Sequence, residues 1–343
     1  MAKLNKLGIV GLTHDHVWHN LGGIKEIENC EFTCVADPNE PLLRKVNETL
    51  NLDEKKLYDD YQEMLSREEL DGVLVFASNH LHAELVEACA AKGLHMMVEK
   101  PMARTVAECD RMIRAANENN VRLMVNFPIM WNADLRNIVD IIRAGKIGRL
   151  WMVKYRDGHK GPRELGCSEY FCDWLYSKEK NGGGALVDFC VYGANVTAAL
   201  LGRPTEISAT SATLVKDIDV EDNGVIIAKY ADKNAMAIIE GTWSQMAQGN
   251  TLGFFGETGS IATNAWAPRE YFINTLEGGL QKLTPPPLPE NENKAVKYFV
   301  NRVRNDQPFD YFVEAEHARM AQEYIDGALQ SIAEKKPVSL LQD

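Results

Sequence analysis

Three residues of this chain, Lys100, Asp188 and Tyr192, are candidates to move a proton in a reaction, because each follows a sequence pattern that could place it beside a ligand. Lys100 lies in Met97-Val98-Glu99-Lys100-Pro101, where an apolar run stops at a charged pair and a proline. Because proline has no N–H to donate to a sheet, Lys100 is expected at the carboxyl end of a buried strand. In open parallel sheets ligands bind just beyond that end, so Lys100 is a candidate catalytic acid or base. The alternative is an ordinary solvated lysine.

Asp188 and Tyr192 follow the triple glycine Gly182-Gly183-Gly184. The glycines let a chain turn tightly against a ligand, and on a helix that starts there residues four apart project on one face. A tyrosine has a pKa near ~10, and a neighbouring ammonium such as that of Lys100 would lower this pKa toward the range in which a base works. The alternative is a buried Asp–Tyr pair that only braces a helix.

The turn after the first apolar strand is the expected place for a dinucleotide phosphate. The ideal G-x-G-x-x-G sequence gives a tight turn, close backbone approach to the phosphate and close helix–strand contact. Here the register reads Gly11-Leu12-Thr13-His14-Asp15-His16, so only the first glycine, Gly11, is kept. Thr13 still offers an N–H and a hydroxyl to a phosphate, and His14 is a candidate hydrogen-bond donor. His16 is expected to push the helix outward.

A metal site is a second interpretation of the same turn. His16 and His19 stand three apart, which is a usual spacing for two ligands on one helix. No cysteine or carboxylate cluster elsewhere in the sequence completes such a site. We therefore expect no metal and interpret the histidines as neighbours of a bound anion.

Further cofactor candidates follow the next strands. Asp37 ends the second strand, where a carboxylate accepts two ribose hydroxyls and repels a 2′-phosphate, so NAD is favoured over NADP. Asp-Pro-Asn is also ordinary turn chemistry. After the third strand, Ser78 or Asn79 can cap the next helix, and this turn overhangs the cofactor in such architectures. The expected cofactor-binding set is Gly11, Thr13, His14, Asp37, Ala77, Ser78, Asn79, His82, Glu99 and Lys100, with His82 equally suited to packing or capping.

Regular alternation of strands and helices positions these residues. Apolar strands are expected at 7–10, 31–36, 71–77, 94–98 and 122–126. Helices are expected between them at 17–27, 40–50, 82–92 and 105–119. Short loops between the two kinds of element imply an α/β fold with a parallel sheet covered on both faces, the doubly wound Rossmann arrangement.

Strand patterns dominate the second part of the chain. Alternation at 206–214 is typical of a half-exposed antiparallel sheet, and a last helix at 311–335 carries one apolar stripe. We expect a dinucleotide-binding Rossmann domain at 1–126 and an α+β domain for substrate binding and oligomerisation at 127–310, with an open, largely antiparallel sheet. Residues 311–343 are expected to form a C-terminal helix that packs back on the core.

Composition narrows the class of protein. The chain has 343 residues, enough for two domains, and its 37 basic and 49 acidic residues give a net charge of −12. Nucleic acid and anionic membranes need a basic face, so neither is an expected partner. No apolar run approaches the ~18–20 residues of a membrane span.

The seven cysteines are odd in number and none forms C-x-x-C, so they are interpreted as buried thiols of a reducing compartment. The N-terminus enters the first strand at once and leaves no room for a signal peptide. The expected location is the cytoplasm.

The combination of Glu99-Lys100-Pro101 with the triple glycine and Asp188 resembles the glucose-fructose oxidoreductase and inositol dehydrogenase family (Gfo/Idh/MocA-type oxidoreductases) over essentially the whole chain. The resemblance implies that Lys100 binds the substrate hydroxyl and aids proton transfer, that Asp188 lies in the substrate site, and that a cis Lys100–Pro101 bond is an option. Tyr192 stands where the inositol dehydrogenase branch has histidine, and is similar to the tyrosine that exchanges the proton in the branch of xylose and dihydrodiol dehydrogenases.

The expected function is an NAD-dependent oxidoreductase acting on a secondary alcohol of a sugar or polyol, and the resemblance implies a homodimer or homotetramer. The segment 159–180 is expected to line the substrate pocket through Arg163, Asp173 and Trp174, with Trp174 either stacked on a sugar or part of the core. Two alternatives stay open. One is an NAD-assisted glycosidase or epimerase without net redox change, and the other is a catalytically silent regulatory protein, which the degraded glycine motif favours.

Overall fold

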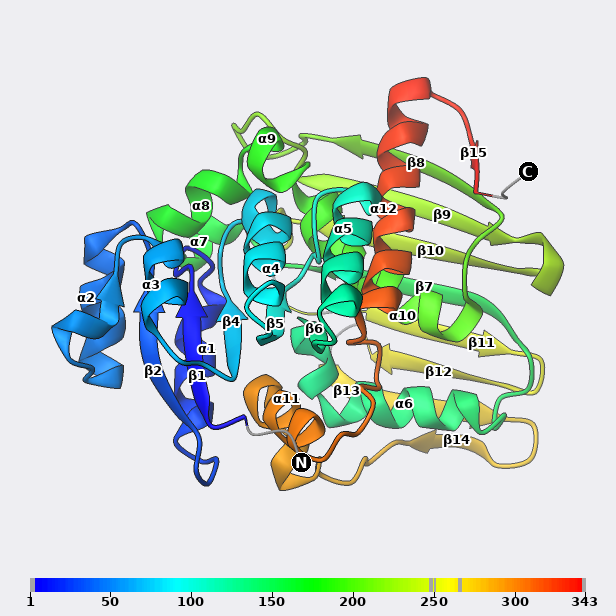
Figure 1. Cartoon of the computed structure of the whole chain (residues 1–343). Coiled ribbons are helices and arrows are strands. Elements are labelled where there is room, and N and C mark those ends of the chain that lie inside the picture. The colour runs from blue at the N-terminus through cyan, green and yellow to red at the C-terminus, as the bar shows by residue number, and fades with distance from the viewer. Residues whose placement is uncertain (1–3, 247–248, 250, 265–266, 341–343) are drawn as a thin grey trace. The chain divides into compact units, whose positions relative to one another are not determined.

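The computed structural model describes residues 4–246, 249, 251–264 and 267–340 (Figure 1). The chain divides into two compact units, and neither is a single stretch of sequence. The first contains Met1–Trp131, Ser168–Trp174 and Leu288–Glu316. The second contains Asn132–Cys167, Leu175–Pro287 and His317–Asp343.

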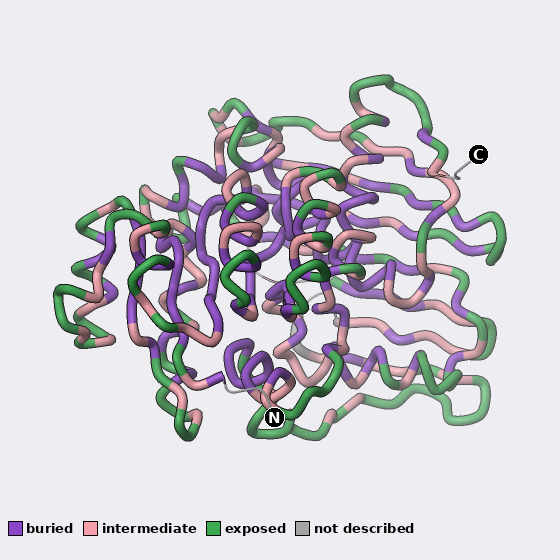
Figure 2. The backbone as a smooth tube through the Cα atoms, viewed as in Figure 1, coloured by how far each residue is buried: buried purple, intermediate pink, exposed green. Residues whose placement is uncertain are grey.

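A six-stranded parallel sheet forms the centre of the first unit, in the order β3-β2-β1-β4-β5-β6. Its strands are β1 (Lys6–Val10), β2 (Glu31–Ala36), β3 (Leu57–Tyr58), β4 (Gly72–Val75), β5 (His95–Glu99) and β6 (Leu123–Asn126). β4 and β6 are buried at every position, as strands covered on both faces should be (Figure 2). The strand order reverses between β1 and β4, which is where open α/β sheets bind ligands. The expected Rossmann sheet is confirmed.

Helices connect these strands as the alternation predicted, with three additions, α3, α8 and α11. The helices of the first unit are α1 (His16–Ile24), α2 (Glu40–Leu50), α3 (Tyr61–Arg67), α4 (His82–Ala90), α5 (Val106–Glu118), α8 (Glu169–Leu175, of which Leu175 is counted with the second unit) and α11 (Ala295–Arg304). Short 3-10 turns lie at Glu54–Lys56, Asn79–Leu81, Pro128–Trp131 and Glu290–Glu292. α8 and α11 come from distant parts of the chain.

α11 packs against the start of the chain, which corrects the expected middle domain of 127–310. Lys297 Nζ lies 2.5 Å from Glu26 Oε2, and Arg304 donates to the carbonyl oxygens of Leu4 and Glu28 at 3.2 and 2.8 Å. These contacts join residues almost three hundred positions apart, and no local pattern in the sequence reports them.

A nine-stranded sheet forms the second unit, in the order β14-β13-β12-β11-β7-β10-β9-β8-β15. Its strands are β7 (Leu150–Gly158), β8 (Glu206–Ala212), β9 (Asn223–Tyr230), β10 (Ala235–Thr242), β11 (Thr251–Gly256), β12 (Gly259–Asn264), β13 (Ala267–Thr275), β14 (Gly279–Lys282) and β15 (Val338–Ser339). Within the described strands β7 and β10 pair in parallel, and the remaining neighbours are antiparallel. The expected largely antiparallel sheet is confirmed.

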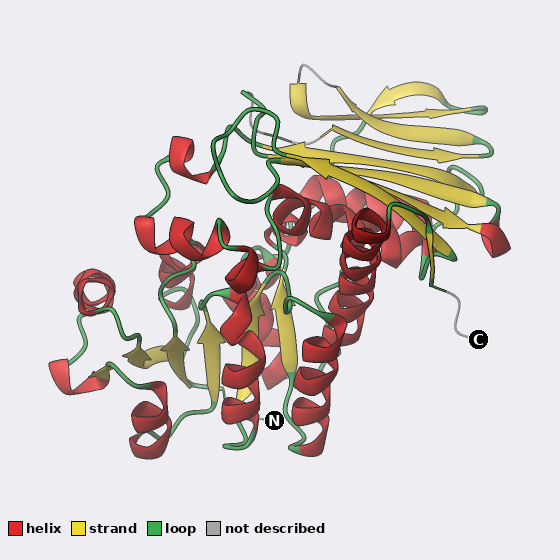
Figure 3. Cartoon of the chain, turned by 90° about the horizontal axis from the view of Figure 1, so that it is seen from above, coloured by secondary structure: helices red, strands yellow, loops and turns green. Residues whose placement is uncertain are grey.

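The helices of the second unit gather on one face of this sheet (Figure 3). They are α6 (Ala133–Arg143), α7 (Pro162–Leu165), α9 (Lys178–Asn181), the π-helical turn η4 (Leu186–Cys190), α10 (Val191–Leu201) and α12 (Ala315–Glu334), with a 3-10 turn at Ala231–Lys233. α12 is held by Tyr324, whose hydroxyl donates to the Gly202 carbonyl at 2.6 Å. The helix begins later than the expected residue 311 because Tyr311 and Phe312 have φ of +55° and +67°, which no α-helix accepts.

One helical stretch among the described residues, Lys178–Leu201, is long and apolar enough by length and composition to cross a membrane. This differs from the expectation that no run approaches such a length. Charged Lys178 and Glu179 and the triple glycine interrupt the stretch, and 89% of its apolar window is buried inside the protein. That burial is typical of a core helix, so the membrane interpretation has little support.

Asp222 organises the connection between β8 and β9. Its carboxylate accepts backbone N–H groups from Leu214, Val215 and Lys216 at 2.7, 2.9 and 2.9 Å, and the Ser244 hydroxyl at 2.8 Å. Burial alone would raise the pKa of Asp222, but the three backbone hydrogen bonds and one from the Asn223 side chain outweigh it and lower the pKa from 3.8 to about 2. The loop therefore depends on an ionised carboxylate.

We expect Asp222→Asn to lower the free energy of unfolding at pH 7 by about 1–3 kcal/mol, because an amide cannot accept all four bonds. The folded pKa lies below the unfolded one, so the contribution is complete above about pH 4 and is lost as the pH falls toward 2. Urea unfolding should thus show a smaller difference between wild type and variant at pH 3 than at pH 7. The exposed Asp232→Asn is the control, and a pH-independent difference would contradict this role.

Candidate active site

The loop between β1 and α1 is fixed by its backbone. Gly11 has φ +80°, and a Cβ placed there would lie 2.7 Å from the Ala77 nitrogen. The Gly11 N–H donates to the Ala36 carbonyl at 2.8 Å, and the His14 N–H donates to the Phe76 carbonyl at 2.9 Å. Two features of the structure therefore require glycine at position 11: the left-handed backbone conformation and the close approach of the loop to the residues that follow β4.

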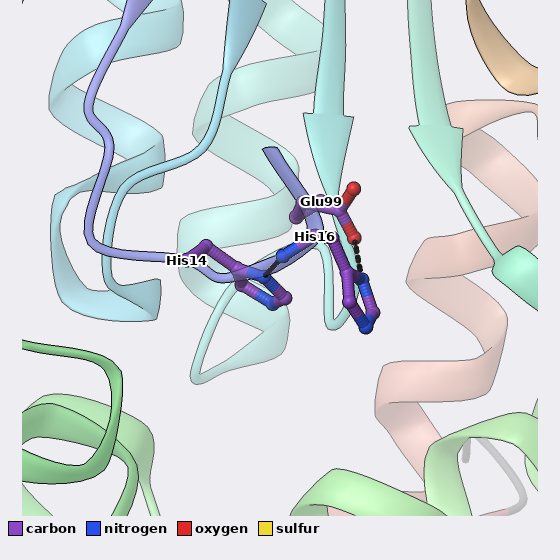
Figure 4. Close-up of side chains that lie close together, drawn as sticks. All are labelled: His14, His16 and Glu99. Atoms are coloured by element: carbon purple, nitrogen blue, oxygen red, sulfur yellow. Dashed lines mark hydrogen bonds and ion pairs between the residues drawn. The ribbon is translucent and has the colours of Figure 1, made fainter. Parts of the chain in front are cut away.

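His16 begins α1 at the position where the ideal fingerprint has its third glycine. Its ring points toward β5 (Figure 4), and His16 Nδ1 lies 2.9 Å from Glu99 Oε2. Glu99 is fully buried, and its other oxygen accepts a hydrogen bond from Asn126 Nδ2 at 2.5 Å. Asn126 Oδ1 in turn accepts from Trp131 Nε1 at 2.8 Å. The bulky His16 is thus accommodated beside a carboxylate that two further side chains orient.

His14 lies under an aromatic cover. Its ring centroid is 4.9 Å from that of Phe171 and 5.5 Å from that of Trp174, and the residue is 1% exposed. Burial, then the charges of His16 and Lys100, hold the pKa of His14 well below its ordinary value. The imidazole is therefore neutral at neutral pH and keeps one nitrogen lone pair.

α8 packs against the loop between β1 and α1. The sequence analysis expected this segment to line the substrate pocket. Trp174 is buried and its Nε1 donates to the Thr13 carbonyl at 3.2 Å. Ser168 donates its N–H and its hydroxyl to Asp15, both at 2.7 Å. Of the two expected roles of Trp174, its position is that of a core residue. Asp173 lies on the exposed side of the same helix.

Asp37 already has partners on both carboxylate oxygens. Oδ2 accepts the Leu12 N–H at 2.6 Å, and Oδ1 accepts the backbone and side-chain N–H groups of Asn39 at 2.8 Å each. Burial raises the pKa of Asp37, and the hydrogen bonds from Asn39 and Leu12 oppose this rise. The carboxylate therefore also holds the loop that contains the fingerprint.

His82 and Ser78 differ from the simplest expectations. His82 is fully buried, with Nε2 3.1 Å from the Ala77 carbonyl and Nδ1 3.1 Å from the Met102 carbonyl, so it packs between two turns. The expected capping of α4 by Ser78 or Asn79 is wrong: a 3-10 turn, Asn79–Leu81, comes between, and Leu81 occupies the cap position without a side-chain bond.

Lys100 directly follows β5 and is 3% exposed. Its peptide bond to Pro101 is cis, which the family resemblance allowed. The first unit thus brings together Gly11, Ala77, His14, His82 and Lys100 around the carboxyl ends of β1, β4 and β5.

The triple glycine of the second unit turns against the protein's own backbone. A Cβ at Gly184 would overlap the Glu221 carbonyl oxygen, and Gly182 has φ +93°. The Gly184 N–H donates to Glu221 Oε1 at 2.6 Å, and the Ala185 N–H donates to the Glu221 carbonyl at 2.9 Å. Close approach to Glu221, which sequence reasoning did not single out, replaces the expected approach to a ligand.

Asp188 lies within a π-helical turn, Leu186–Cys190, and Tyr192 lies in the first turn of α10, which follows it. Residues four apart stay on nearly the same side of a helix in either kind of turn, so the common face expected for the two residues stays a prediction. Asp188 Oδ2 accepts a hydrogen bond from Trp243 Nε1 at 3.0 Å, and Asp188 and Tyr192 are each 7% exposed. Single π turns are frequent at functional sites. Arg163, also in this unit, is exposed and lies 4.6 Å over the Tyr176 ring.

Comparison with known proteins gives a family for both parts of the chain. Residues 6–127 match the model of an oxidoreductase family with an NAD-binding Rossmann fold. Residues 135–262 match the model of the GFO/IDH/MocA C-terminal domain. Together these matches cover most of the chain.

Individual relatives are distant. The myo-inositol 2-dehydrogenase of Thermotoga maritima is 22% identical, and the match covers 98% of each chain. The 2,7-anhydro-N-acetylneuraminate hydratase of Mediterraneibacter gnavus is 25% identical over 63% of this chain and 56% of its own length. A solved levoglucosan dehydrogenase, in complex with NADH and levoglucosan, has the same fold with a TM-score of 0.83 at 18% identity, covering 98% of this chain and 99% of that one. The chain belongs to the Gfo/Idh/MocA family of NAD-binding oxidoreductases.

Proposed function

We propose that this protein is a dehydrogenase that transfers hydride between NAD and a secondary alcohol of a sugar or polyol derivative. The observation that carries the proposal is Lys100, a buried lysine at the carboxyl end of β5 in an NAD-binding Rossmann unit. The names of two relatives, a myo-inositol dehydrogenase and a levoglucosan dehydrogenase, support the substrate class.

The first unit fits a dinucleotide. Gly11 adopts a positive φ and has no Cβ, so a phosphate can approach its backbone closely. The nearby residue Thr13 supplies an N–H and a hydroxyl for a phosphate. Asp37 would accept the ribose hydroxyls, and Ala77, Ser78, Asn79 and Glu99 stand at the neighbouring strand ends. When bound, the nicotinamide supplies the hydride acceptor or donor.

Lys100, Tyr192 and Asp188 are the proposed proton-handling groups. Tyr192 exchanges the proton of the substrate hydroxyl, and Lys100 binds that hydroxyl and stabilises the phenolate of Tyr192. Asp188 orients Lys100 or a second hydroxyl. Arg163 and Asp173 remain candidates for substrate contacts because both are exposed.

The test is a panel of sugars and polyols with NAD, in which NADH is followed by absorbance. Stoichiometric NADH release supports the dehydrogenase. One relative is named a hydratase, so turnover without NADH accumulation, but requiring bound NAD, would favour the enzyme without net redox change. If the folded protein binds neither NADH nor NADPH in a calorimetric titration, both enzyme proposals fail and a regulatory role gains support.

Asp37→Ala is expected to raise the Kd for NADH about 10- to 100-fold, because charge-assisted bonds to the ribose and the anchor on Leu12 are both lost. The Kd for NADPH should rise less, since the carboxylate also repels a 2′-phosphate. Fluorescence titration of both nucleotides measures this, with the exposed Asp59→Ala as control. Equal weakening for the two nucleotides would argue against contact with the ribose.

A homodimer or homotetramer is proposed from the open face of the nine-stranded sheet. Trp151, Ile227 and Met236, on three adjacent strands, are 41%, 41% and 38% exposed, and apolar patches of this kind mark protein interfaces. Ile227→Glu with Met236→Glu should reduce the mass measured by light scattering to that of a monomer. An unchanged mass would exclude this face as the interface.

The proposed compartment is the cytoplasm. All seven cysteines lie in the described part of the chain, and no disulfide joins them there, as is usual in a reducing compartment.

A further inference from the structure

Three side chains of metal-binding type converge at the ends of β1 and β5 (Figure 4). One ligand atom each of His14, His16 and Glu99 lies within 4.8 Å of the other two. The sequence offered histidines of this turn as candidate ligands but not Glu99, which stands more than eighty residues from them. The other histidine of the turn, His19, is exposed on α1 and takes no part.

The surroundings of Glu99 resemble the support that metal sites give their ligands. Asn126 fixes one carboxylate oxygen at 2.5 Å, and Trp131 fixes Asn126 at 2.8 Å. The second oxygen, Oε2, lies against His16 Nδ1. Such outer partners hold a ligand in its binding orientation before the ion arrives.

The two histidines can both offer a lone pair. His14 Nδ1 accepts the backbone N–H of His16 at 3.3 Å, a long hydrogen bond that a metal ion could replace. His16 Nδ1 meets only Glu99 in the same cluster and would exchange that 2.9 Å contact for a shared ion. Tetrahedral zinc bonds of ~2.0–2.2 Å place ligand atoms roughly 3.4 Å apart, so shifts of about 1 Å would close the site.

We propose that His14, His16 and Glu99 bind one divalent metal ion of the zinc class, with a fourth position left for water or a ligand oxygen. Two histidines and one glutamate form a ligand set used by zinc sites that keep an open position, and imidazole with carboxylate suits zinc, cobalt and related ions better than magnesium. The inference does not depend on the proposed dehydrogenase activity, because it concerns ion binding by the nucleotide-free protein.

Lys100 gives the proposal an electrostatic signature. Lys100 lies close enough to the His14 ring for the two side chains to interact electrostatically. A divalent cation bound there would be repelled by the positive charge of Lys100. Removing the charge with Lys100→Met should therefore tighten metal binding at least about 3-fold, whereas a merely hydrogen-bonded cluster would give no such effect.

The experiment uses the full chain without an affinity tag, freed of nucleotide and dialysed against chelator. Zinc is titrated calorimetrically, and cobalt(II) is titrated while its visible absorption is recorded. We expect one ion per chain. His16→Ala and Glu99→Gln should each weaken binding at least 10-fold, and His19→Ala should leave it unchanged. Circular dichroism confirms that each variant is folded.

Binding well below one ion per chain would overturn the proposal. The proposal would also be overturned if His16→Ala and Glu99→Gln bound zinc as tightly as wild type. The same holds if His19→Ala lost as much affinity as those two variants, because the ion would then be held elsewhere. Since no nucleotide or substrate is present, a failure of the dehydrogenase proposal would not alter this result.

Discussion

Replacing Lys100 with methionine is expected to lower kcat/KM by about 10²- to 10⁴-fold, the usual contribution of a positioned acid or base. Methionine keeps the buried apolar stem of a residue that is 3% exposed, so the fold should survive. The ammonium that binds the substrate hydroxyl is lost, so substrate binding and the chemical step should suffer while binding of NADH changes little. NADH fluorescence titration should give a Kd within a few-fold of wild type, while initial rates on the true substrate fall.

The matched control is Lys92→Met, which removes an exposed lysine just after α4. Its rates should equal those of wild type. Tyr192→Phe extends the test to the second unit by deleting one hydroxyl, and it should also reduce kcat/KM by at least about 10²-fold. If both Lys100→Met and Tyr192→Phe keep nearly normal rates in folded protein, the assigned proton roles are wrong.

Gly184→Ala is expected to have the largest effect on stability, a loss of about 3 kcal/mol or more. The added Cβ would overlap the carbonyl oxygen of Glu221, which cannot move away because it accepts the Ala185 N–H at 2.9 Å. Clash with a fixed backbone is more costly than clash with a flexible side chain. Urea unfolding followed by circular dichroism measures the loss, and a very low yield of folded protein would be the extreme form of the same result.

Gly22→Ala is the control for this variant. Gly22 lies in α1 and is exposed, and a Cβ added there would have no atom within 4 Å beyond its chain neighbours and its own helix backbone. Alanine should therefore raise the free energy of unfolding by about 0.5–1 kcal/mol. If the two substitutions shift the unfolding midpoint equally, close packing at Gly184 is not what the glycine provides.

The alternating first third was predictable because five of its six strands are signalled locally. β4 and β6 are continuous apolar runs, and they could only be buried between two layers of helices. In the second unit β8 was visible from the alternation at 206–214. The two-residue strands β3 and β15 were not, since two residues carry no periodicity.

The candidate site was predictable where one residue's type decides its place. Lys100 and Gly11 are of this kind. The pairing of His16 with Glu99 and the contact of Gly184 with Glu221 were not, because both join residues far apart in sequence. The π turn at Leu186–Cys190 was also missed, since a pattern of apolar residues does not distinguish i→i+5 from i→i+4 bonding.

The interleaving of the two units along the chain constrains how the protein is made. The first unit contains Leu288–Glu316 in addition to the N-terminal segment, so a ribosome that has completed residue 131 has not yet supplied α11. The first unit would remain incomplete, with the apolar side of α1 exposed to solvent, until α11 has been translated. Domains that are contiguous fold as they emerge, whereas here final folding must be largely post-translational. A fragment that stops at Trp131 should for the same reason be a poor substitute for the intact unit.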